Sequence, residues 1–114
     1  ITSFCTTPSD PLPLLYMAMI DLNYKYYFVD GQKLPDLESI LLHEFGHLVG
    51  LNHSCAGSGA SGVPDCSSAS ISPDYLAAVM APIFNFDQSG YGETKRLLTK
   101  NDQGRANCLY KTAQ

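Results

Sequence analysis

The chain has 114 residues, of which 45% are hydrophobic and 16% are charged, and its formal net charge is -4. This length suits a single domain covering residues 1–114, and the composition is typical of a folded globule and not of a disordered tail. The seven Lys and Arg are scattered and outnumbered by eleven Asp and Glu, so we expect no nucleic-acid partner.

The N-terminal part of the chain has the character of strands and their connections. Residues 1–4, ITSF, favour a β conformation, and we interpret them as an edge strand. The apolar run from Pro11 to Ile20 is too short to span a bilayer, so we expect no membrane span. Aromatic and branched residues then alternate with polar or smaller ones, which predicts a strand from Met17 to Tyr24 and a turn at Asp30 and Gly31.

Three tyrosines lie close together at the end of this predicted strand, namely Tyr24, Tyr26 and Tyr27. Such a cluster is compatible with an aromatic binding platform or with packing in a sheet. We interpret it as strand packing, because aromatic residues are enriched in strands.

A helical period begins at residue 36. Asp36 follows a proline and is a suitable N-cap. The negative charge of Glu38 in the first turn interacts favourably with the helix dipole. Apolar residues then recur at spacings of three and four, and these are Leu37, Ile40, Leu41, Phe45 and Leu48. The pattern predicts a helix that runs from Asp36 to Gly50.

The four cysteines form no CxxC pair, which argues against a cysteine zinc knuckle or a redox site and favours disulfides. We therefore expect an oxidising compartment and an extracellular or secreted protein. Cys55 and Cys66 lie in a Gly/Ser-rich loop, and a bridge between them would stabilise the fold by roughly 3 kcal/mol in the chain-entropy model. Cys5 with Cys108 is the second expected bridge, in one of the three pairings that four cysteines allow.

Two helical segments are predicted after the loop. Residues 74–84, DYLAAVMAPIF, hold a short helical turn before Met80, and Pro82 prevents its continuation. Thr99 is a suitable N-cap, and Asp102 three residues later completes a capping box. A terminal helix is expected to follow.

All three histidines of the chain fall within residues 43–53, HEFGHLVGLNH. His43 and His47 are four residues apart, so on a helix both imidazoles face the same way and can share one metal ion. Glu44 lies about 100° around the helix axis from His43, beside the ion, where a carboxylate acts as a base and not as a ligand.

A third ligand requires the helix to end. On a continued helix His53 would lie about 9 Å beyond His47, too far for a shared ion with nitrogen bonds of about 2.0–2.1 Å. Gly50 provides the break, because glycine readily adopts the left-handed conformation of a helix C-terminus. Three neutral imidazoles leave a fourth tetrahedral position for water, which is the arrangement of a catalytic zinc site.

The string HExxHxxGxxH is matched without a substitution by His43, Glu44, His47, Gly50 and His53. The chain thereby resembles the metzincin metalloproteases. AVMAPIF, with Met80, is similar to the methionine turn of that clan. Ser54 after the third histidine and Pro82 after the methionine resemble the matrixins, the matrix metalloprotease group. MIDLN and LTKNDQGRANCLY look most like the bacterial secreted members.

The resemblance implies an α+β, zincin-like fold with a reduced N-terminal sheet, an active-site helix, the methionine turn and a terminal helix. Catalytic domains of the family have a longer N-terminal half, so this chain is expected to be either a minimal member or a truncated piece that lacks the first strands and a helix. Ala81 stands where matrixins commonly have a tyrosine. No tyrosine lies two residues after Met80, where some metzincins carry an extra ligand, so three protein ligands are expected.

The expected function is that of a zinc-dependent endopeptidase acting on a peptide or protein substrate. His43, His47 and His53 would hold one Zn²⁺, and Glu44 would accept the proton of the zinc-activated water as general base. The alternative is a zinc-binding but catalytically inactive fragment or a protein-binding domain. We expect a monomer. No DxDxDG loop is present, so Ca²⁺, which many relatives bind, is only a further candidate at Asp21, Asp30 and Asp87.

Overall fold

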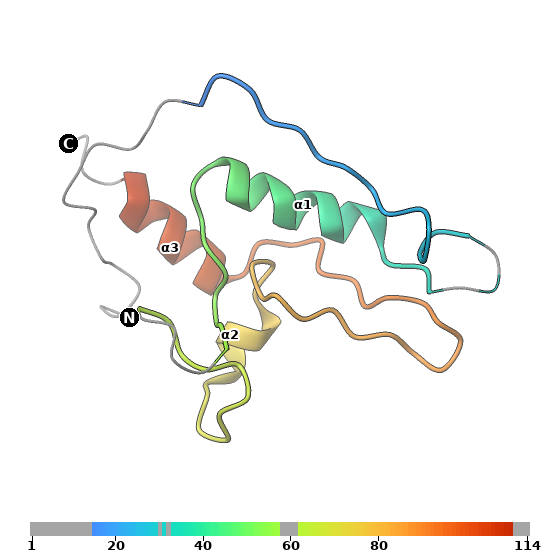
Figure 1. Cartoon of the computed structure of the whole chain (residues 1–114). Coiled ribbons are helices and arrows are strands. Elements are labelled where there is room, and N and C mark those ends of the chain that lie inside the picture. The colour runs from blue at the N-terminus through green and yellow to red at the C-terminus, as the bar shows by residue number, and fades with distance from the viewer. Residues whose placement is uncertain (1–14, 30, 32, 58–61, 111–114) are drawn as a thin grey trace.

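The computed structural model describes residues 15–29, 31, 33–57 and 62–110. Its helices are α1 at Leu37–Leu48, α2 at Pro73–Ala77 and α3 at Lys100–Tyr110. As Figure 1 shows, α1 crosses the centre of the molecule, between residues 15–23 on one side and the chain leading into α3 on the other. The edge strand predicted at residues 1–4 lies outside the described residues.

α1 begins where the sequence predicts, at a cap formed by Asp36. The Asp36 carboxylate accepts hydrogen bonds from Ser39 N at 3.1 Å and from Ser39 Oγ at 2.6 Å. Arg96, far along the chain, donates from Nε to the same oxygen at 2.8 Å. The hydrogen bonds from Arg96 and then Ser39 hold the pKa of Asp36 well below its usual range. One carboxylate therefore caps α1 and joins it to the segment that precedes α3.

The two later helices also agree with the sequence pattern. α2 has Pro73 at its first position and ends at Ala77, before the methionine. Ahead of α3, Thr99 Oγ1 accepts from Asp102 N at 3.3 Å, and the Asp102 carboxylate accepts from Thr99 N at 2.9 Å. The predicted capping box is confirmed.

The predicted strand from Met17 to Tyr24 is wrong. Residues 15–23 have no regular secondary structure, and residues 24–26 form a turn. A segment with alternating residues forms a strand only where its backbone N–H and C=O groups hydrogen-bond to a neighbouring strand. Residues 15–23 make no backbone–backbone hydrogen bond within the described part of the chain. Between described residues, β pairing consists of isolated bridges such as Tyr27 with Lys33. The reduced N-terminal sheet is therefore not formed by these residues.

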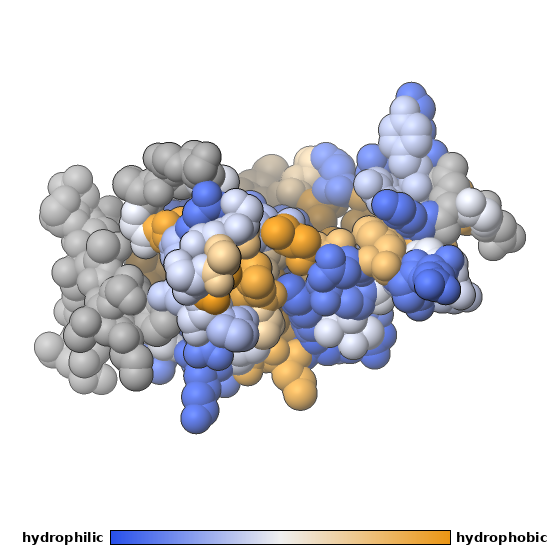
Figure 2. All heavy atoms as spheres, turned by 90° about the horizontal axis from the view of Figure 1, so that it is seen from below, coloured by the Kyte–Doolittle hydropathy of each residue, from blue (hydrophilic) through white to orange (hydrophobic). Residues whose placement is uncertain are grey.

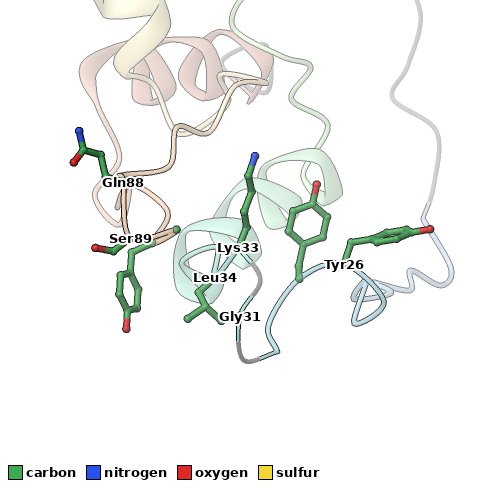
Figure 3. A pocket seen from close by; sticks show the side chains of 9 residues that line it. Tyr26, Gly31, Lys33, Leu34, Gln88 and Ser89 are labelled. Carbon is green, nitrogen blue, oxygen red and sulfur yellow. The ribbon is translucent and has the colours of Figure 1, made fainter.

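The prediction that the tyrosines pack in a strand is wrong for the same reason. Tyr24 and Tyr26 are 58% and 57% exposed. Tyr26 and Tyr27 instead line an open hollow of about 780 Å³ together with Lys33 and the turn that contains Gln88 (Figure 3). Without a neighbouring strand, their rings have no sheet to pack against.

The buried core is small and lies between α1 and α3. It consists of Leu51, Val79 and Met80, with Leu42, Ala106 and Leu109 packed against it. α1 turns its polar side toward the protein, because Ser39 is fully buried while Phe45 is 50% exposed. In Figure 2, apolar atoms interrupt the hydrophilic surface across the middle of the face seen from below.

Cys55 and Cys66 form a disulfide, as predicted. Cys108 is disulfide-bonded, and Cys5 lies outside the described residues, so the second predicted pairing stays a prediction. A disulfide fits an oxidising compartment. None of the helices in the described ranges has the length and apolarity that crossing a bilayer requires.

Candidate metal centre

α1 places two imidazoles on one of its faces. The ring centroids of His43 and His47 are 4.8 Å apart, and their planes are nearly perpendicular, at 84°. The two Nε2 atoms face each other at 3.1 Å. This is the relation that a spacing of four residues gives on a helix.

The end of α1 is a Schellman motif built on Gly50. Gly50 N donates to His47 O at 3.0 Å, and Leu51 N donates to Gly46 O at 2.9 Å. Gly50 has a φ of 99°, a left-handed conformation that favours glycine. The chain therefore turns away from the helix axis at the residue where the sequence predicts the break.

His53 returns to the histidine pair after this break. Its ring centroid lies 5.2 Å from that of His43 and 4.9 Å from that of His47. Ligand nitrogens of the three imidazoles all lie within 4.8 Å of one another. The predicted trio is thus brought together by the structure.

Two backbone carbonyls determine which nitrogen of each helical histidine carries its proton. Nδ1 of His43 lies 2.7 Å from Val79 O, and Nδ1 of His47 lies 2.7 Å from Leu51 O. A carbonyl oxygen only accepts, so each Nδ1 must carry the hydrogen. Both Nε2 atoms then present lone pairs to each other at 3.1 Å, an arrangement that a cation between them would stabilise.

The donor set fits a zinc ion. Two nitrogens bound to one tetrahedral Zn²⁺ at about 2.05 Å would stand about 3.3 Å apart. The observed Nε2 separation of 3.1 Å is close to this value. Histidines that bind zinc through one ring nitrogen usually donate a hydrogen bond from the other ring nitrogen, often to a backbone carbonyl.

Within the described residues, the histidine trio is the one group of three or more His, Cys, Asp or Glu side chains placed to share an ion. Asp21 and Asp87, candidates for Ca²⁺, belong to no such group, and Asp30 lies outside the described residues. The calcium expectation therefore gains no support here.

Glu44 lies beside the trio without joining it. Burial lowers the pKa of His53, and the neighbouring His43 and His47 lower it further, whereas the negative charge of Glu44 is close enough to raise it. The lowered pKa favours the neutral imidazole, which is the form that binds metal. Glu44 is thus near the three histidines and outside their group, and its role as a base stays a prediction.

A groove of about 460 Å³ opens next to Glu44 and His47. One wall is α1, and the other is the irregular segment that contains Leu15, Met19 and Ile20. The groove therefore combines apolar walls with the carboxylate of Glu44 and the imidazole of His47.

Met80 is 1% exposed and packs against Gly46 of α1. A Cβ built on Gly46, which precedes His47, would overlap Met80 Sδ. Met80 O accepts a hydrogen bond from Ser54 N, the residue after His53, at 2.9 Å. The segment around Met80 thus contacts both α1 and the residue after His53, while Pro82 lies at the surface.

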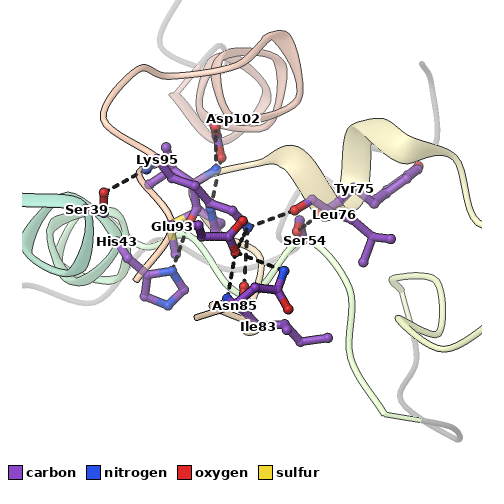
Figure 4. Close-up of polar contacts among 12 residues, drawn as sticks. Ser39, His43, Ser54, Tyr75, Leu76, Ile83, Asn85, Glu93, Lys95 and Asp102 are labelled. Carbon is purple, nitrogen blue, oxygen red and sulfur yellow. Dashed lines mark hydrogen bonds and ion pairs between the residues drawn. The ribbon is translucent and has the colours of Figure 1, made fainter. Parts of the chain in front are cut away.

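Asp102 has a second role that its capping pattern does not indicate. Its buried carboxylate accepts hydrogen bonds from Val79 N at 3.0 Å and from Met80 N at 3.2 Å (Figure 4). The carbonyl of Val79 in turn accepts from His43. A carboxylate on α3 is therefore linked to His43 on α1 through the peptide unit between Val79 and Met80.

Arg105 was also not indicated by the sequence. Its Nη2 donates to His53 O at 3.1 Å, and burial lowers the pKa of its guanidinium. A single arginine on a helix gives no signal of such a contact, because its acceptor lies 52 residues earlier.

Comparisons with known protein families, curated proteins and solved structures find no match to this chain.

Proposed function

We propose that this chain is a zinc-dependent endopeptidase whose metal is held by His43, His47 and His53. The observation that carries the proposal is the pair of Nε2 atoms 3.1 Å apart, each on an imidazole whose Nδ1 donates to a carbonyl. Three histidine ligands leave a coordination position for a reacting group, as catalytic zinc sites do. The metzincin-like spacing of these residues supports the same function.

The residues around the site have separate tasks in peptide hydrolysis. A bound Zn²⁺ supplies Lewis acidity to water and to the carbonyl of the scissile bond. Glu44 takes the proton of the attacking water and delivers it to the leaving amine. The carbonyls of Val79 and Leu51 hold the two imidazoles so that their Nε2 atoms face each other, where a metal ion would bind.

The groove beside Glu44 supports a peptide as the substrate. Its outer wall, residues 15–20, has peptide groups that make no backbone–backbone hydrogen bond within the described ranges. An extended peptide can pair with such backbone groups while its side chains contact the apolar walls. A substrate bound in this way would lie across Glu44 and His47.

Substitution of Glu44 tests the proposal. We expect Glu44→Gln to retain one zinc per chain and to lose hydrolysis of a quenched peptide library by about 100- to 10,000-fold, because the general base is removed. Glu38→Gln is the matched control, since Glu38 is an exposed carboxylate in the first turn of the same helix. Undiminished cleavage by Glu44→Gln would refute the role of Glu44.

The same measurements distinguish an endopeptidase from the alternative, a zinc-binding domain that does not cleave peptides. One zinc per wild-type chain with no cleavage at any enzyme concentration would assign the chain to a zinc-binding domain without turnover. The half-exposed apolar residues of α1, such as Phe45 and Leu48, are the observation that favours that alternative.

We also propose that the protein acts outside the cell. The Cys55–Cys66 disulfide supports this location, because disulfides persist in oxidising compartments. Mass spectrometry of the protein from its native source would find this disulfide intact if the location is right.

A further inference from the structure

Lys95 carries an ammonium group that is largely removed from solvent, since its side chain is 9% exposed. Nζ donates to Leu76 O at 2.8 Å and to Ile83 O at 3.3 Å, and it forms an ion pair with Glu93 at 3.6 Å. An ammonium has three hydrogens to donate, and here three acceptors surround it. Lysine is rarely this buried, so the contacts require an explanation.

The two carbonyls that Lys95 binds lie on either side of the methionine turn. Residues 78–81, between Leu76 and Ile83, are at most 1% exposed. Figure 4 shows the Lys95 side chain reaching both Leu76 and Ile83. One cation thus ties together the two ends of the segment that carries Val79 and Met80.

This segment contacts the metal centre at several points. Val79 O accepts from His43 Nδ1 at 2.7 Å, and Met80 O accepts from the residue after His53. Phe84, directly after Ile83, places its ring centroid 5.6 Å from that of His43. Lys95 Nζ lies 5.4 Å from the centroid of the same Phe84 ring. The position of His43 therefore depends on a segment that Lys95 holds.

The main chain of Lys95 is bound to the helix that carries His43. Lys95 N donates to Ser39 Oγ at 2.7 Å, and Ser39 is fully buried. Ser39 precedes His43 by four residues and so lies on the same face of α1. Lys95 thus connects the element that supplies the ligand with the segment that supplies its hydrogen-bond acceptor.

We propose that Lys95 is a positioning residue for His43. It fixes the distance between α1 and residues 76–83, so that Val79 O and the Phe84 ring hold the His43 imidazole with Nε2 toward the metal. The proposal rests on the proposed zinc site, and it adds a residue that no part of the zinc signature contains.

Two substitutions and a control test this role. Lys95→Met keeps the aliphatic stem and removes the ammonium, so we expect the Zn²⁺ dissociation constant, from chelator competition, to rise about 10- to 100-fold, the range seen when outer-shell partners are lost. The His43 Nδ1–H proton resonance of the metal-free protein should shift or disappear. Lys95→Arg keeps the charge, so its Zn²⁺ dissociation constant and its His43 resonance should lie closer to the wild-type values than those of Lys95→Met. Lys100→Met removes the same charge from an exposed position and should change neither.

A purely structural role gives a different result. If Lys95→Met loses stability toward urea but binds Zn²⁺ within about twofold of wild type, with the His43 resonance unmoved, the proposal is overturned. If Lys95→Met does not fold, Lys95→Gln, which also removes the charge but keeps a polar side chain, decides the question. Wild-type affinity and an unmoved resonance in Lys95→Gln overturn the proposal, and a shifted resonance with affinity weakened about threefold or more supports it.

The proposed function and this inference can fail separately. A wild-type protein that binds no Zn²⁺ refutes the proposed function. The His43 resonance of the metal-free variants still reports whether Lys95 positions that ring.

Discussion

Gly92 shows how closely single residues are packed around the start of α1. A Cβ at this position would lie 2.9 Å from Pro35 Cα and 3.1 Å from Asp36 N, which are backbone atoms. Because backbone cannot move aside as a flexible side chain can, we expect Gly92→Ala to lower the free energy of unfolding by about 1–3 kcal/mol. Urea unfolding followed by circular dichroism measures this change.

Gly104 is the matched control for that substitution. It lies within α3, and a Cβ there would meet nothing within 4 Å. Gly104→Ala should raise the free energy of unfolding by about 0.4–1 kcal/mol, because alanine restricts the unfolded chain and favours the helix. Equal effects of the two substitutions would contradict the packing described for Gly92.

At the same scale, the clustering of the three histidines could be predicted because their relation is local. The helical period sets His43 against His47, and one left-handed residue, Gly50, returns the chain to His53. The acceptor of His43 could not be predicted in the same way. Val79 is 36 residues away, and no local pattern relates the two.

At the N-terminus of α1, the carboxylate of Asp36 both caps the helix and forms an ion pair with Arg96. Asp36→Ala removes both, and we expect it to lower the free energy of unfolding by about 1–2 kcal/mol at neutral pH. Asp36→Asn keeps a capping oxygen for Ser39 but not the charge that faces Arg96. It should therefore lower the free energy of unfolding by less than Asp36→Ala does.

The contribution of this charge should depend on pH. The pKa of Asp36 is lowered in the folded protein from an ordinary value of 3.8, so its stabilising effect is complete above that value. It is lost as the pH falls through the lower pKa of the folded state. Urea unfolding at pH 6 and pH 3 should therefore show the difference between wild type and Asp36→Asn becoming smaller at the lower pH. An unchanged difference would show that the Arg96 contact does not form in solution.

Among the elements, the helices were predictable and the strand was not. Capping residues such as Asp36 and Thr99 act on the helix that they precede, so sequence alone locates the helix start. The alternation from Met17 to Tyr24 required a neighbouring strand, and the described residues contain none for it. The zincin-like fold therefore stays a prediction.

For the whole molecule, the Cys55–Cys66 disulfide should link stability to metal binding. Replacing both residues by serine removes a constraint that spans a separation of 11 residues, and we expect a loss of roughly 3 kcal/mol. Cys55 follows His53 by two residues, so the Zn²⁺ affinity should fall as well. Thermal unfolding with and without Zn²⁺ measures both effects. A variant with wild-type zinc stabilisation would show that the third ligand does not depend on the bridge.

The exposed surface of the molecule was the feature least accessible to prediction. The apolar stripe of α1 indicates a buried face, yet Leu37, Phe45 and Leu48 are 39–50% exposed. Polar hydrogen bonds of Ser39 and His43 direct the opposite side of α1 inward. Hydrophobic periodicity predicts that a helix forms, but the partners of its faces depend on contacts far along the chain.

The carboxylate of Asp102 has a consequence for protein synthesis. A ribosome that has translated as far as residue 99 has already released all three imidazoles, but not the carboxylate that holds Val79 and Met80. Nor has it made Arg105, which holds the backbone of His53. If the trio binds metal as proposed, a nascent chain should therefore capture it poorly until α3 has also emerged, although all three imidazoles precede that helix.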